Sequence, residues 1–170
     1  MKLTLEPKRL ALGDVRTVTD GAGQVRYRIK VRRTLRGRRF CLYDADGILL
    51  ARICRPKPRV AFTHTRYTVY LPREPWAELW EDGPYRWRFA GPEWTAEGTH
   101  REAAFCIRRE GSPVLRAVGR PTYWGTVYEL ELSEAVRPTA AVACGLALIC
   151  VFEEQRRVDA RRKAGAGKVH

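Results

Sequence analysis

Cationic and apolar side chains alternate through residues 25–32, which read Val-Arg-Tyr-Arg-Ile-Lys-Val-Arg. A period of two, with β-branched and aromatic residues on one parity, predicts a β-strand that buries one face. Cations on the other parity lie about 6.6 Å apart along such a strand. The exposed face would therefore carry a stripe of four positive charges: Arg26, Arg28, Lys30 and Arg32.

A stripe of this kind suits phosphate groups, and more cations lie close to it in the sequence. Each charge near an anionic membrane contributes about 1 kcal/mol, so four give about 4 kcal/mol, which corresponds to millimolar affinity. The stripe alone would not hold the protein on a membrane. We expect help from further candidate residues, namely Arg36, Arg38, Arg86 and Arg88, and from the basic C-terminal segment. The alternative interpretation is a merely solvated strand face.

Two motifs resemble ligand-binding loops and fail on inspection. Asp44-x-Asp46-Gly47 begins like a calcium loop, but Ile48 and Arg55 stand where the next ligands are needed. The motif therefore predicts a hairpin turn. Gly165-Ala166-Gly167-Lys168 resembles the end of a P-loop, but Val169 replaces the required Ser or Thr.

Catalytic and metal-binding patterns are missing from the sequence. Its only serines are Ser112 and Ser133, and its three histidines are not at metal-ligand spacing from any cysteine. The five cysteines contain no CxxC pair, which is typical of buried thiols in a reducing compartment: Cys41, Cys54, Cys106, Cys144 and Cys150. We expect a cytoplasmic protein that is not an enzyme and binds no metal or cofactor.

The 170-residue chain has a formal net charge of +13, with 32 Lys and Arg against 19 Asp and Glu. Such an imbalance favours anionic partners, which include nucleic acid, acidic protein and anionic lipid. It does not choose among them, and a compositional origin of the charge stays open.

One uninterrupted apolar run, residues 140–152, follows Pro138 and predicts a helix over about 138–155. Every face of this helix is apolar, so every face must be buried. The run spans roughly 20 Å, against roughly 30 Å of bilayer hydrocarbon, which favours a helix enclosed by protein. We expect its larger side chains to form the core: Val142, Cys144, Leu146, Leu148, Ile149 and Phe152.

Short alternating segments precede this helix and predict a series of antiparallel strands. Residues 60–62 are one such segment, whereas residues 75–80 fit either a short helix or an extended segment. Residues 40–56 and 105–121 align without a gap, with Phe-Cys at both starts and Arg-Pro at both ends. We interpret them as two related meander halves, about twelve strands in all, closed into a barrel around the helix. The tryptophans are expected to pack in the barrel wall.

The sequence resembles the LURP-one-related family of the tubby C-terminal-like superfamily, which includes the phospholipid scramblases. The resemblance rests on residues 40–47, which contain Phe-x-Leu-x-Asp-x-Asp-Gly, and on residues 124–130, Trp-Gly-Thr-Val-Tyr-Glu-Leu. It implies a mainly β fold with a closed barrel of about twelve strands around a hydrophobic helix. We divide the chain into a lead-in of short strands (1–24), the barrel with its helix (25–155) and a basic disordered tail (156–170).

Three functions fit these observations. The first is a non-catalytic binding module for anionic phospholipid at a membrane surface, or for another phosphate-rich partner, acting as a peripheral protein and by default a monomer. The second is a nucleic-acid-associated protein that uses the same cations. The third is a scramblase-like lipid-handling protein whose apolar helix inserts into the bilayer.

Overall fold

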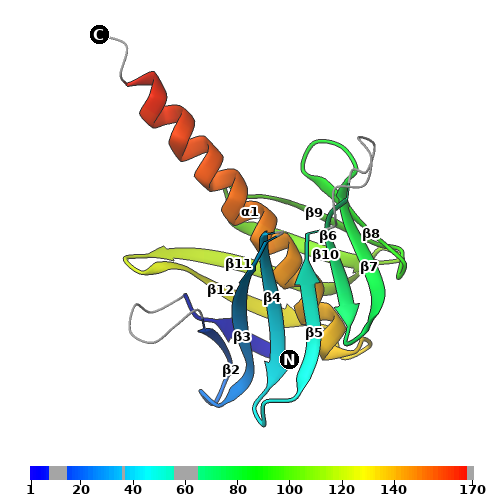
Figure 1. Ribbon diagram of the computed structural model, residues 1–170. Coiled ribbons are helices and arrows are strands. Elements are labelled where there is room, and N and C mark those ends of the chain that lie inside the picture. The colour runs from blue at the N-terminus through cyan, green and yellow to red at the C-terminus, as the bar shows by residue number, and fades with distance from the viewer. Residues whose placement is uncertain (8–14, 36, 56–64, 168–170) are drawn as a thin grey trace.

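A computed structural model describes residues 1–7, 15–35, 37–55 and 65–167 (Figure 1). These residues form twelve strands and one helix. In chain order they are β1 (Lys2–Leu5), β2 (Val15–Asp20), β3 (Val25–Thr34), β4 (Gly37–Asp44), β5 (Leu49–Cys54), β6 (Thr65–Leu71), β7 (Glu74–Glu81), β8 (Arg86–Ala90), β9 (Trp94–Thr99), β10 (Ala104–Arg109), β11 (Ser112–Thr122), β12 (Gly125–Leu132) and α1 (Pro138–Ala166).

Each strand pairs antiparallel with the next one in sequence, and β1 pairs with β12 to close the barrel. Closure removes every sheet edge, which is the usual protection of an antiparallel sheet against edge-to-edge association. The predicted fold class, a closed antiparallel barrel of about twelve strands around a C-terminal helix, is confirmed.

The first 24 residues are part of the barrel, which corrects their expected role as a lead-in. Leu3 and Leu5 are 2% and 1% exposed and point into the core. The terminal ammonium of Met1 donates a hydrogen bond of 3.0 Å to the carbonyl of Leu132 on the last strand. The barrel therefore begins at β1, because this strand pairs with the edge of β12 that β11 leaves open.

Residues 140–152 of α1 lie inside the barrel, and every one of them is buried. Phe152 contacts the rings of Trp87 and Phe105 at centroid distances of 6.2 and 5.7 Å. A Cβ atom at Gly145 would lie 3.1 Å from Leu115 Cδ1, so the small helix residues let large wall residues approach the axis. The prediction that the apolar run forms the core is confirmed for all six named side chains: Val142, Cys144, Leu146, Leu148, Ile149 and Phe152.

The helix does not end near residue 155 but continues to Ala166, so most of the expected disordered tail is helical. Its last turns project from the barrel (Figure 1). Residues 153–164 are largely Arg, Glu, Gln, Lys and Ala, all strong helix formers, which explains the continuation. Barrel contacts also hold the emerging turns, because His100 Nε2 lies 2.7 Å from Asp159 Oδ2.

The internal repeat corresponds to the hairpins β4–β5 and β10–β11, six strands apart in the barrel. Both hairpins carry a register shift after the equivalent residue, Leu42 in the first and Ile107 in the second. The gapless alignment is wrong beyond the turn, because the second turn is shorter. Leu42 pairs with Ala51, whereas Ile107 pairs with Leu115, one position earlier in the repeat.

Three more predictions concern residues 75–80, the tryptophans and residues 60–62. Residues 75–80 are extended and belong to β7, which pairs with both β6 and β8. Trp87 and Trp94 are buried in the wall as expected, but Trp124 is 53% exposed. The strand expected at residues 60–62 lies outside the described residues.

Among the described residues, α1 is the one helix long and apolar enough to cross a membrane. The core helix of a soluble protein passes the same test, and the apolar part of α1 is enclosed by the barrel wall.

Leu148→Asp is expected to abolish folding, because an unpaired carboxylate would replace a fully buried side chain. The cost, several kcal/mol, is a large share of the stability of a typical domain. Circular dichroism with thermal melting checks this, and Val158→Asp on the exposed part of the same helix is the control. A Leu148→Asp variant that melts cooperatively at the wild-type temperature would contradict the buried helix.

Candidate functional site at the helix exit

The place where α1 leaves the barrel is ringed by polar side chains from several strands. Arg16 on β2 donates a hydrogen bond of 2.9 Å from Nη1 to Glu153 Oε1, and its Nε donates to the carbonyl of Glu6 at 3.2 Å. One helix turn further on, Arg156 and Asp159 bind the segment after β9. These contacts fix how far the helix extends beyond the barrel wall.

Arg156 is held by three hydrogen bonds to uncharged acceptors. Its Nε donates to the His100 carbonyl at 2.9 Å, Nη1 to Thr126 Oγ1 at 3.0 Å and Nη2 to the Tyr128 hydroxyl at 3.1 Å. The described residues supply no carboxylate within ion-pair distance of this guanidinium. Arg156 therefore presents a positioned positive charge that the surrounding residues leave unneutralised.

A second group of contacts at the exit centres on Glu154, a carboxylate paired with two arginines. Glu154 accepts hydrogen bonds from Tyr67 and Arg55, and Arg66 Nη2 lies 3.6 Å from Glu154 Oε2. Burial alone would raise the pKa of Glu154, but the hydrogen bonds from Tyr67 and Arg55 and the nearby positive charges outweigh it and lower this pKa. Burial above all raises the pKa of Tyr67, so its hydroxyl stays protonated and donates.

A cavity of about 340 Å³ opens beside Arg156, and we call it the basic cavity. Five arginines and one carboxylate, that of Glu153, line it together with the Trp124 ring. The arginines come from four elements that the barrel brings together: Arg16 from β2, Arg33 from β3, Arg38 from β4, and Arg156 and Arg157 from α1. Arg33 and Arg38 are direct cross-strand partners.

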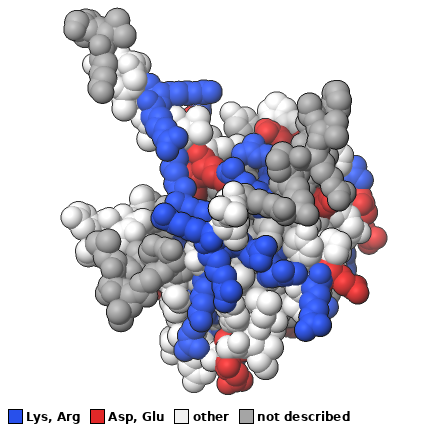
Figure 2. All heavy atoms as spheres, viewed as in Figure 1, with Lys and Arg blue, Asp and Glu red and all other residues white. Residues whose placement is uncertain are grey.

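The predicted stripe on β3 lies on the outer face of the barrel, and the same strand contributes Val31 and Arg33 to the cavity. Its four cations are exposed, and Tyr27 and Ile29 between them are buried. Arg28 donates to the Ala45 carbonyl at 2.8 Å, and Lys30 Nζ lies 5.1 Å from the centroid of the Tyr43 ring. Figure 2 shows Lys and Arg side chains gathered over the face of β3–β5 and along the projecting helix.

Other predicted site residues lie elsewhere. Arg86 and Arg88 are on β8, five strands around the barrel from β3, so they do not extend the stripe. Arg88 forms an ion pair with Glu93 and lies 5.6 Å from the Trp80 ring. Arg38 joins the basic cavity, whereas Arg36 lies outside the described residues.

Sequence reasoning missed the special position of three residues. Arg16 and Arg156 carry no local signal, because they meet only when β2, β12 and α1 are assembled. Trp124 was noted as part of a family motif and was expected to pack in the barrel wall with the other tryptophans. It stands with Tyr123 in the β11–β12 turn, where the two rings make an edge contact with centroids 5.0 Å apart. Tyr123 is 92% exposed, so this turn presents an aromatic pair to solvent beside the basic cavity.

Side chains that could bind a metal ion do not come together in the described part of the chain. No group of three or more His, Cys, Asp or Glu side chains comes together there. All five cysteines are free thiols, and burial raises the pKa of Cys144 and Cys150 above the ordinary value, which makes these two thiols unreactive.

Glu154→Gln is expected to destabilise the protein at pH 7 by about 1 kcal/mol, because a charge-assisted hydrogen bond is weakened. A lowered folded-state pKa contributes stability above the ordinary value of 4.5, and this contribution is lost as the pH falls through the folded value. The difference in melting temperature between wild type and variant should therefore shrink below pH 4.5. Glu134→Gln, at an exposed position, is the control. A difference that stays constant down to pH 3 would contradict a role for the ionised carboxylate.

Comparison with known proteins gives one result. The family model described as LURP-one-related matches residues 1–150, which covers the barrel and nearly all of the enclosed helix. Searches of curated proteins and of solved structures find no match. The order of strands, the enclosed helix and this match agree, and the chain belongs to the LURP-one-related family.

Proposed function

We propose that this protein is a non-catalytic binding module that takes anionic phospholipid headgroups at its basic cavity. The observation that carries the proposal is Arg156, a half-buried guanidinium fixed by three neutral acceptors at the wall of a cavity rich in arginine. Arginine is the side chain best suited to bind phosphate through several donors at once.

Charge in and around the cavity supports a phosphate ligand. Glu153 is the single carboxylate in the lining, and Arg16 already pairs with it. The other four arginines of the lining form no ion pair with a described residue, so an incoming phosphate meets little competition. They are Arg33, Arg38, Arg156 and Arg157.

The cavity also changes the expected affinity. Four stripe cations contribute about 4 kcal/mol, and four cavity arginines add a similar amount, about 8 kcal/mol together. This sum corresponds to micromolar rather than millimolar affinity for an anionic surface. The stripe and the cavity both include residues of β3, so an anionic surface that contacts both gains from each cluster.

The aromatic pair at the β11–β12 turn supports a membrane as the source of the phosphate. Tyr and Trp concentrate at the boundary between headgroups and hydrocarbon, where an apolar ring and a polar tip are both accommodated. Trp124 lines the basic cavity, so its ring would enter the interface while the arginines bind headgroups. We therefore propose peripheral binding by a cytoplasmic monomer, and the free thiols support a reducing compartment.

The other two functions have weaker support. A bilayer-inserted helix would require the twelve-stranded barrel to release residues 140–152, the whole of its central core. Nucleic acid remains the second candidate, because the exposed stripe on β3 is long enough to follow a phosphate backbone. A cavity of about 340 Å³ admits a headgroup but not a duplex, which favours lipid.

Replacing Arg33 and Arg38 together by Ala should weaken binding to vesicles of phosphatidylcholine with phosphatidylserine by about 30-fold, since two surface charges are worth about 2 kcal/mol. Cosedimentation of the full chain at constant ionic strength measures this. Arg86→Ala with Arg88→Ala on the distant β8 strand is the control with the same charge change and should weaken binding less.

A salt titration with a DNA duplex separates the two partner classes. Tight, salt-sensitive binding to DNA with no vesicle binding would replace the lipid proposal by the nucleic-acid one. Indifference of wild type to both anionic vesicles and DNA would reject both.

Trp124→Ala should reduce vesicle binding without changing the melting temperature, because the ring is 53% exposed. Loss of an interfacial aromatic ring removes about 1–2 kcal/mol of partitioning, equivalent to about tenfold in affinity. Cosedimentation checks this, with Tyr85→Ala, another exposed aromatic position, as the control. Equal losses in both variants would contradict a specific role for the β11–β12 turn.

A further inference from the structure

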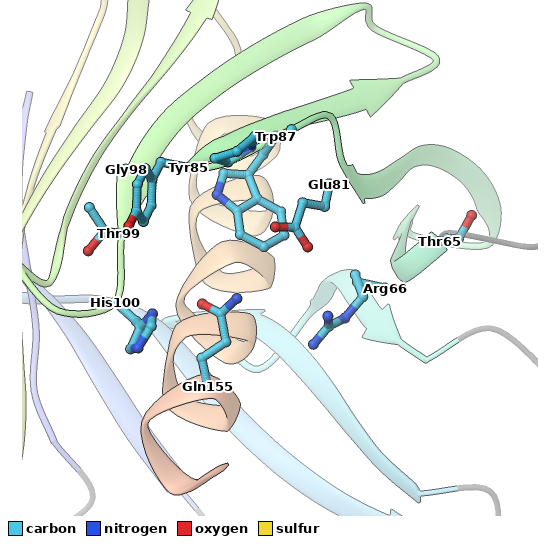
Figure 3. A pocket seen from close by; sticks show the side chains of 11 residues that line it. Thr65, Arg66, Glu81, Tyr85, Trp87, Gly98, Thr99, His100 and Gln155 are labelled. Carbon is cyan, nitrogen blue, oxygen red and sulfur yellow. The ribbon is translucent and has the colours of Figure 1, made fainter. Parts of the chain in front are cut away.

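A second and larger cavity lies on another side of the helix exit, between α1 and the strands β6–β9. Its volume is about 720 Å³, within the range of small-molecule sites. Figure 3 shows the side chains that line it, and those used below are Arg66, Glu81, Tyr85, Trp87, Thr99 and Gln155. The basic cavity shares none of these residues.

Trp87 is the feature that marks this cavity as a binding site. Its side chain is only 3% exposed, yet the indole Nε1–H has no hydrogen-bond partner in the described part of the chain. Buried donors are normally paired, because an unpaired donor loses its hydration without compensation. Contact with Phe152 at a centroid distance of 6.2 Å packs the ring against the helix, so the donor cannot easily turn toward solvent.

Further hydrogen-bonding groups share the cavity. In Figure 3 the Gln155 side chain rises from the helix toward the Trp87 ring, and Thr99 lies across the cavity from Arg66. Together these groups offer an amide, a hydroxyl and a guanidinium as donors around the indole N–H. The cavity is therefore suited to a ligand that accepts hydrogen bonds.

Charge distinguishes this cavity from the basic one. Arg66 is partly neutralised by Glu154, at 3.6 Å, and the exposed Glu81 lies in the same lining. His100, also in the lining, pairs with Asp159 at 2.7 Å. A dianionic phosphate would gain little electrostatic stabilisation in this cavity. The nearly balanced charge favours a carbonyl oxygen, as in an amide or a monocarboxylate, and the Trp87 and Tyr85 rings favour a flat apolar body.

We propose that this cavity binds a small molecule that carries a carbonyl oxygen, amide or carboxylate, on a flat apolar body. The oxygen accepts the hydrogen bond of Trp87 Nε1–H, which a shift of the lining side chains must first uncover because this atom is buried. Gln155 and Thr99 contact the same group or its neighbours, and the Tyr85 ring covers the body from the cavity mouth. This site stands independently of phospholipid binding, because it uses different residues and a different ligand chemistry.

The probes that test this site are benzoate and benzamide, which share a shape and differ in charge, with inorganic phosphate as a third arm. Nuclear magnetic resonance of the ¹⁵N-labelled full chain resolves one indole signal for each of the five tryptophans. The Trp87 signal, identified by its loss in Trp87→Phe, should shift saturably with benzoate or benzamide at millimolar concentration. The Trp124 signal, from the exposed turn, should not.

Variants then separate a built site from a general solvent effect. Trp87→Phe keeps an aromatic ring and removes the donor, and should lower affinity about tenfold when the Gln155 amide signal reports binding. Gln155→Leu should lower it several-fold at an unchanged melting temperature. The proposal is overturned by a Trp87 signal that ignores both organic probes, by equal linear shifts of all five indole signals, or by a response to phosphate alone. Because phosphate and vesicles test the basic cavity, failure here leaves the phospholipid proposal standing, and the reverse also holds.

Discussion

The barrel and its helix depend on each other through the burial of residues 140–152. A closed barrel of twelve strands is too wide to be filled by the side chains of its own wall, and a helix that is apolar on every face has no stable place in water. The helix fills the interior of the barrel, and the barrel shields the helix from water. The small residues along the helix set the distance between axis and wall, as the contact of Gly145 with Leu115 illustrates.

The end of the apolar segment sets the position of every candidate site. Directly after Phe152 the chain turns from wholly apolar to strongly charged, and the first charged residues meet the rim of the barrel. Glu153, Glu154 and Arg156 bind different strands there, so the helix is fixed in both rotation and depth. Both cavities discussed above are spaces between this fixed helix and a wall that widens around it.

The sequence predicted the parts of this structure that follow from local pattern. Alternation identified β3 and its exposed cations, the turn motif at Asp44 identified the β4–β5 hairpin, and the apolar run identified the core. The pairing of strands that are distant in sequence could not be predicted in this way. The role of β1, the register after the β10–β11 turn and the meeting of Arg16, Arg38 and Arg156 depend on barrel closure, which no short window of sequence contains. The prediction ended the helix near residue 155 because the following segment is strongly charged, although its residues have high helix propensity.

The position of the helix at the end of the strand series constrains how the chain reaches its native state. During synthesis all twelve strands leave the ribosome before the segment that fills them, so the sheet cannot close over its final core until α1 has been made. Until then the inward faces of the strands, including Phe89 and Tyr128, have no helix to cover them. The last step is the docking of α1 and the pairing of β1 with β12, the strands most distant in sequence. A nascent chain of this fold thus carries an exposed apolar sheet until α1 docks.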